Sequence, residues 1–116
     1  MVHKNSRLKL REYEFERRTF TAEFIRFGHA SNSMLTTVLL NDVKDEFGVI
    51  VASHIWLSKA KLFYKAKLNH GDPVMFTGFV MRYKKGLYGT ITDFTICNIA
   101  HVKNVSEIQD HEVPYI

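Results

Sequence analysis

Residues 71–98 constrain the fold more than any other part of this chain. The stretch opens with Gly71-Asp72-Pro73, which predicts a turn because glycine accepts positive φ and proline cannot continue a helix. Beyond it, side chains alternate as far as Tyr83, a basic loop punctuated by glycines follows, and a second alternating segment covers residues 90–99. A period of two is typical of strands, so the stretch predicts a β-hairpin whose tip mixes cations with aromatic rings.

The segments before this hairpin show the same alternation, with one interruption. Three further strands are predicted at residues 19–27, 34–42 and 49–56. Between the third strand and the hairpin, apolar residues recur at helical spacing among lysines, which predicts a short helix over residues 59–68. Ser58 is its expected N-cap, and Gly71 lies near its expected C-terminal cap.

Three strands, one helix and two strands form the element order of a known small fold. The sequence predicts an all-β protein: a five-stranded OB-fold Greek-key barrel with one short α-helix between strands three and four. A different small barrel is the alternative. We expect the OB-fold domain to span residues 19–105. A charged N-terminal arm precedes this domain at residues 1–18, and a short acidic C-terminal tail follows it at residues 106–116. The arm is either exposed to solvent, a frayed first strand, or a segment that contacts phosphates.

Composition narrows the classes of function. The net charge of +4 permits an anionic partner, and no apolar run reaches the length of a membrane span. The charged N-terminal residues lack a signal-peptide pattern and Cys97 is the only cysteine, so we expect a cytoplasmic protein with no membrane partner. The six histidines lack metal-ligand spacing, and no nucleophile elbow or phosphate-binding loop is present. We therefore expect no enzyme activity, no cofactor and no metal.

Three segments carry a resemblance to a known family: VLLND at residues 38–42, GVIVASHIW at 48–56 and GDPVMFTGFV at 71–80. In these the chain resembles small OB-fold single-stranded DNA-binding proteins, and it is similar to those of phages, plasmids and other bacterial mobile elements. The resemblance implies binding of single-stranded DNA with little sequence preference, which protects the strand during replication, recombination or transfer.

The C-terminal tail adds a second point of resemblance. Three acidic residues precede an apolar residue, a proline and an aromatic ring, namely Val113, Pro114 and Tyr115. This order is similar to the tails of bacterial single-stranded DNA-binding proteins, and it implies docking of replication or recombination proteins. Ile116 follows and a flexible linker is missing, so a tail packed on the barrel is an equal alternative.

In an OB-fold the ligand lies across strands two and three, between the loops that flank them. Aromatic rings stack on bases and cations replace counterions on phosphates. These criteria select the candidate nucleic-acid-binding residues Arg26, His29, Asn32, Lys44, Phe47, His54, Trp56, Arg82, Tyr83, Lys84, Lys85 and Tyr88. For Trp56 two roles stay open, a stacking platform or a residue that closes the barrel against the helix.

Two alternatives to single-stranded DNA binding remain. The ligand is RNA in the first, because no motif in the chain reports on recognition of the 2′-hydroxyl. In the second, the barrel is a protein-interaction module, a subunit or an inhibitor. Met75, Phe79 and Met81 alternate with core positions and predict a second apolar surface, so we also expect a homodimer or higher oligomer.

Overall fold

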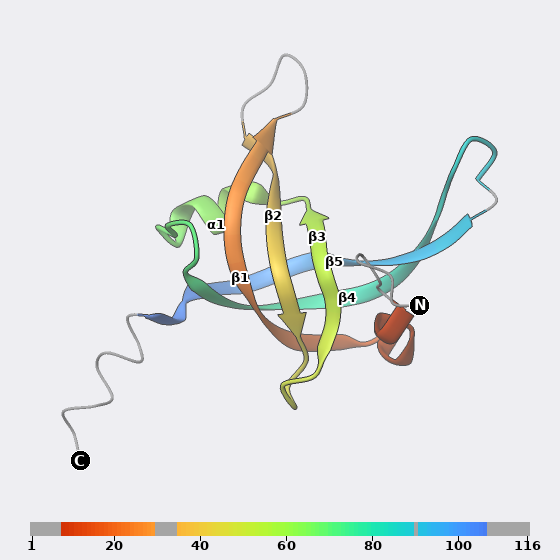
Figure 1. Cartoon of the computed structure of the whole chain (residues 1–116), viewed down its shortest axis with the longest axis horizontal. Coiled ribbons are helices and arrows are strands. Elements are labelled where there is room, and N and C mark those ends of the chain that lie inside the picture. Colours follow the sequence, from red (N-terminus) through yellow and green to blue (C-terminus); the bar gives the residue numbers. More distant parts are fainter. Residues whose placement is uncertain (1–7, 30–34, 90, 107–116) are drawn as a thin grey trace.

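The computed structural model describes residues 8–29, 35–89 and 91–106. Within them the chain forms one antiparallel sheet of five strands in the order β3-β2-β1-β4-β5, with a short α-helix and an N-terminal 3₁₀ helix (Figure 1). The elements are η1 Leu8–Tyr13, β1 Arg17–His29, β2 Leu35–Lys44, β3 Ile50–Leu57, α1 Ala60–Lys65, β4 Pro73–Lys85 and β5 Ile91–Asn104. The predictions of an all-β chain and of one helix between the third and fourth strands are confirmed.

The strands are longer than predicted and the helix is shorter. β1 begins at Arg17 rather than at residue 19, and β5 continues to Asn104. Helix α1 ends at Lys65, and the predicted N-cap at Ser58 is wrong, because Lys59 occupies that position with φ 65° and caps the helix with no side-chain hydrogen bond. Lys67, with φ 57°, adopts the left-handed conformation that often ends a helix. The sequence gives no sign of these two left-handed lysines, since glycine is the usual residue there.

Alternation of side chains builds the core between two layers. In Figure 1 the layer of β1, β2 and β3 lies in front of β4 and β5. Phe20 and Phe76 are fully buried and their ring centroids lie 5.7 Å apart, while Phe63 of α1 packs on Phe76 at 5.6 Å. Phe24 and Phe94, which also lie in alternating segments of the sequence, are buried as well. The core therefore joins both layers to the helix.

No strand pairing joins the two edges of the sheet, β3 and β5, in the described part of the chain. The 3₁₀ helix η1 contacts β3, β4 and β5, and its Leu10 is completely buried in the common core. After η1, the backbone amide of Phe15 donates to the carbonyl of Val80 at 2.7 Å, and the amide of Val80 donates to the carbonyl of Glu16 at 3.0 Å. Residues 8–18, which the sequence predicted as a charged arm, thus contribute to the core and to the sheet.

No helix among the described residues is long and apolar enough to cross a membrane.

Candidate nucleic-acid interface

Trp56 lies on the outer face of the β1–β2–β3 layer, the side away from the core. Its neighbours Ile55 and Leu57 are buried, whereas 38% of Trp56 is exposed, as the alternation of a strand requires. Trp56 pairs with Leu39 on β2, and Leu39 pairs with Arg26 on β1. The indole therefore lies on the outer surface of this layer, which is in front of β4 and β5 in Figure 1, and not in the core.

Gly28 allows the indole of Trp56 to pack directly against the backbone of β1. A Cβ atom at Gly28 would lie 2.7 Å from Cζ3 of Trp56 and 2.7 Å from Oγ1 of Thr37, so only a hydrogen fits between them. The guanidinium carbon of Arg26 lies 5.0 Å from the centroid of the Trp56 ring, a distance at which cation and ring attract. The first predicted strand ended at residue 27. The structure extends β1 to His29 and so includes Gly28, where close approach of the ring requires a residue without a side chain.

Trp56 and Tyr83 line one open surface hollow of about 510 Å³. We call it the Trp56 hollow, and its lining residues are Thr37, Trp56, Leu57, Ser58, Tyr83 and Thr95. Two aromatic residues from β3 and β4 therefore flank one space, and none of the lining residues carries a negative charge. Such a hollow suits a flat ring attached to an anionic backbone.

Two other predicted residues on this layer lie away from the hollow. His54, partly buried, precedes Trp56 by two positions and pairs with Asn41. Lys44 lines a different hollow together with Glu23 and Asp42. Two carboxylates beside this lysine make its surroundings less favourable for an anion than those of Trp56.

The cations of the β4–β5 hairpin have partners within the protein. Arg82 forms an ion pair with Glu14, with two hydrogen bonds that lower the pKa of that carboxyl and raise the pKa of the guanidinium. Lys85 lies 2.8 Å from a carboxylate oxygen of Asp93, and the ammonium of Lys84 donates to Oγ1 of Thr92 at 2.8 Å. The hairpin therefore offers less uncompensated charge than its sequence predicts.

Two predicted aromatic residues lie apart from the Trp56 hollow. Tyr88 is 83% exposed and follows the end of β4 in the β4–β5 connection. Phe47 is 76% exposed in the turn that precedes β3, whereas Trp56 lies near the end of that strand. Trp56 lies six positions after Ile50 along the extended strand, a separation of roughly 20 Å. Phe47 and Trp56 therefore cannot stack on the same base.

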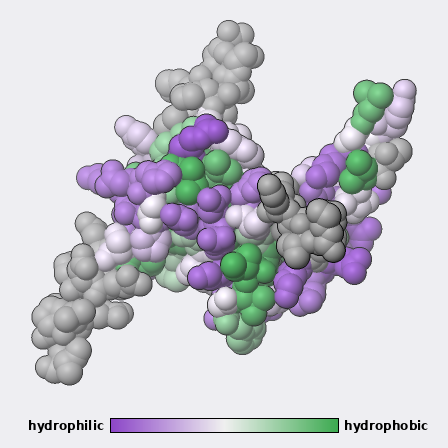
Figure 2. All heavy atoms as spheres, in the orientation of Figure 1, coloured by the Kyte–Doolittle hydropathy of each residue, from purple (hydrophilic) through white to green (hydrophobic). Residues whose placement is uncertain are grey.

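Figure 2 shows a hydrophobic area at the lower end of the molecule, over this turn, on a face that is otherwise largely hydrophilic. Three exposed apolar residues lie in and next to this turn, Phe47, Val49 and Ile50, and we call them the turn patch. Contiguous exposed apolar side chains often mark an interaction surface. The turn patch therefore adds a second candidate surface, distinct from the Trp56 hollow.

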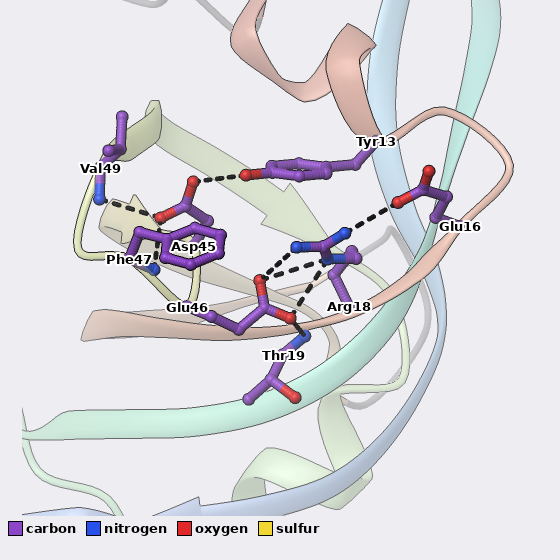
Figure 3. A network of polar contacts seen from close by, with 8 residues as sticks. All are labelled: Tyr13, Glu16, Arg18, Thr19, Asp45, Glu46, Phe47 and Val49. Atoms are coloured by element: carbon purple, nitrogen blue, oxygen red, sulfur yellow. Dashed lines mark hydrogen bonds and ion pairs between the residues drawn. The ribbon is translucent and has the colours of Figure 1, made fainter.

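A polar network holds the turn patch in place (Figure 3). The buried carboxylate of Asp45 accepts hydrogen bonds from the Tyr13 hydroxyl at 2.6 Å, from the amide of Phe47 at 2.8 Å and from the amide of Val49 at 3.0 Å. Burial by itself would raise the pKa of Asp45, but these donors and nearby Arg18 hold it below its ordinary value. The hydrogen bond to Asp45 raises the pKa of Tyr13 to about 12. The turn is thus fixed by a residue 32 positions away, which no local sequence signal reveals.

Arg18 ties the same network to the start of β1. Its guanidinium carbon lies 4.2 Å from the centroid of the Tyr13 ring, and its nitrogens contact Glu46 at 3.0 Å and Glu16 at 2.9 Å. The amide of Thr19 also donates to Glu46, at 3.2 Å. Hydrogen bonding to Arg18 lowers the pKa of Glu46. Arg18, a charge of the predicted arm, is therefore engaged with carboxylates of the protein.

Part of the predicted site lies outside the described residues: Asn32, Val113, Pro114 and Tyr115. His29 is described only as the last residue of β1. Among the residues that the structure describes, no three histidine, cysteine, aspartate or glutamate side chains converge on a point that could hold a metal ion.

Comparison with protein-family models, with curated proteins and with solved structures finds no significant match.

Proposed function

We propose that this chain is an OB-fold protein that binds single-stranded DNA with little sequence preference. The order β3-β2-β1-β4-β5, with a helix between β3 and β4, supports the fold. The edge strands β3 and β5 contact each other without pairing, and the OB-fold is a partly open barrel. Its ligand surface is the outer face of β2 and β3, the face that carries Trp56.

One observation carries the proposal: an exposed indole shares one hollow with a tyrosine from another strand, and the guanidinium of Arg26 lies 5.0 Å from the centroid of the indole ring. Stacking of a base on such a ring contributes roughly 1–3 kcal/mol, and it is tolerant of sequence because every base has a flat face. Arg26, which is exposed, is available to a phosphate beside the stacked base. The sequence contains no feature that reads base edges, so weak base preference is expected.

The test is a titration of fluorescent oligo-dT, oligo-U and a duplex at two salt concentrations. We expect oligo-dT to bind and the affinity to fall with salt by a slope of about 0.7 per phosphate neutralised. Trp56→Ala should weaken oligo-dT binding by roughly 5- to 150-fold, the equivalent of about 1–3 kcal/mol. Phe47→Ala is the matched control, since it removes an exposed ring that does not line the hollow.

Three results would reject parts of this proposal. No binding of oligo-dT at low salt would reject the function itself. Equal losses from Trp56→Ala and Phe47→Ala would reject the site. Tighter binding of oligo-U than of oligo-dT would identify RNA as the ligand in place of DNA.

In the cell such a protein would protect single strands during replication, recombination or transfer, in the cytoplasm and without catalysis. The protected DNA would be that of a phage, a plasmid or another mobile element, because the sequence resembles the small OB-fold proteins of such elements. The acidic tail would then serve to recruit other replication or recombination proteins. These statements rest on the sequence resemblance described above.

The turn patch favours a second candidate function, a protein-interaction barrel. Phe47, Val49 and Ile50 are 76%, 42% and 46% exposed, and Asp45 fixes the turn that presents them. By contrast, Met75 and Phe79 of the predicted apolar stripe are partly buried, and Met81 is 39% exposed. Binding to an apolar protein surface would respond to salt far less than binding to a nucleic acid. The salt titration therefore distinguishes the two functions.

A further inference from the structure

A second hollow on this protein combines aromatic rings with cations. It has a volume of about 500 Å³ and lies between α1, the turn after it and β1. We call it the α1 hollow, and its lining residues are Phe27, Tyr64, Lys65, Lys67 and Leu68. In Figure 1, α1 passes behind β1 and β2. Its Phe63 is buried in the core, whereas Trp56 is exposed on the outer face of the sheet.

The tyrosine of the α1 hollow is exposed yet held in place. Tyr64 is 62% exposed, and its ring centroid lies 6.0 Å from that of Phe27. Phe27 in turn packs on the buried Phe24, at 5.0 Å between centroids. A chain of rings thus supports Tyr64 from the core and leaves part of the tyrosine open to solvent. A ring that is already ordered loses little conformational freedom when a base stacks on it.

The charged residues that line this hollow are both positive, Lys65 and Lys67. The nearby carboxylate of Asp72 accepts hydrogen bonds from the side-chain amide of Asn104 and from the backbone amide of Asn69. Lys67 has a φ of 57°, a conformation that lysine seldom adopts. A helix dipole accounts for a lysine in the last turn of α1, but it does not account for an exposed ring that lines one hollow together with two lysines.

We propose that the α1 hollow is a second contact site for the same single strand, with a base on Tyr64 and phosphates on Lys65 and Lys67. This inference rests on the proposed function. Two consecutive residues of β1 connect the rings of the two hollows: Phe27 packs on Tyr64, and Gly28 lies against Trp56 on the opposite face of the sheet. A short oligonucleotide reaches one hollow only, and a longer strand passes around the end of β1 to reach both.

The test compares oligo-dT of about 4 and about 16 nucleotides, the limits of the site size of one OB-fold. Lys65→Glu with Lys67→Glu should weaken binding of the longer strand about 10-fold or more and reduce its salt slope by about 1.4, for two phosphates lost. Tyr64→Ala should weaken it by roughly 5- to 150-fold with an unchanged salt slope. Neither change should alter binding of the short strand or quenching of Trp56.

The matched control is Lys61→Glu with Lys103→Glu, which makes the same change of charge at two exposed lysines outside both hollows. An equal effect of the control pair would overturn the proposal, because the hollow would then contribute only its share of net charge. Equal affinity of the wild type for the two lengths would also overturn it. Poly-glutamate that competes as well as oligo-dT at equal charge would show a general anion surface instead. If the wild type binds neither length, the proposed function fails first, and the second contact fails with it.

Discussion

Gly28→Ala tests whether the indole of Trp56 is seated as the structure describes. The backbone of Gly28 has no positive φ, so alanine fits it and would by itself stabilise the protein by about 0.4–1 kcal/mol. The new Cβ atom, however, would lie 2.7 Å from Trp56 and 2.7 Å from Thr37, which is 0.7 Å short of the 3.4 Å at which ordinary contacts begin. Overpacking of this kind costs about 1–3 kcal/mol. We expect a net loss of stability of about 1–2 kcal/mol, because the indole must tilt outward.

The assay for Gly28→Ala is urea denaturation combined with the emission spectrum and near-ultraviolet circular dichroism of Trp56, the only tryptophan in the chain. The emission maximum should move to longer wavelength as the ring becomes more exposed, and affinity for oligo-dT should fall. In a Trp56→Ala background the same substitution should cost less by about 1 kcal/mol, since one of its two close contacts is gone. A stabilised variant with an unchanged spectrum would refute the described packing of Trp56 on Gly28. An equal loss of unfolding free energy in both backgrounds would refute it as well.

Three further predictions concern the N-terminal segment and the predicted apolar stripe. Tyr13→Phe should destabilise the protein by about 1.5–3 kcal/mol at neutral pH, because Asp45 loses a hydrogen bond to its charged form. Urea denaturation should show that this loss of stability becomes smaller as pH falls through the lowered pKa of Asp45. It should also become smaller as pH rises from about 10 to about 12, because wild-type Tyr13 then loses the proton that it donates to Asp45. A loss of stability that is constant over the whole pH range would contradict the network. Leu10→Ala should cost about 2–5 kcal/mol in the same assay, whereas a solvated arm would give a cost near zero. Light scattering at high micromolar concentration should give a mass above 13.5 kDa, and Met81→Lys should reduce it; a monomeric wild type would rule out self-association.

Alternation was enough to predict the sheet and much of its core. Phe20, Phe24, Phe76 and Phe94 each lie in an alternating run, and each is buried. The same pattern failed for Leu10, because η1 is six residues of mixed charge without a readable period. Leu10 is buried because η1 packs against β3, β4 and β5, and this packing surface forms only when the strands have assembled.

The candidate site was predictable by residue type but not by arrangement. Aromatic and basic residues were predicted in the third strand and in the hairpin, yet the ion pair of Arg82 with Glu14 spans 68 positions of sequence. Long-range partners of this kind decide which cations remain available, and a local pattern does not contain them. The contact between Gly28 and the ring of Trp56 was missed for a related reason. A glycine followed by polar residues is typical of a turn, and the sequence does not show which ring covers it.

The most direct measurement of the central claim is the intrinsic fluorescence of Trp56 during a titration with unlabelled oligo-dT. Because the chain has one tryptophan, any change in emission reports on the Trp56 hollow. The account predicts a saturable change in intensity whose midpoint equals the dissociation constant from the labelled-strand titration, unchanged in Phe47→Ala. Unaltered Trp56 emission at concentrations where the labelled strand is fully bound would contradict it, because the strand would then lie elsewhere on the protein.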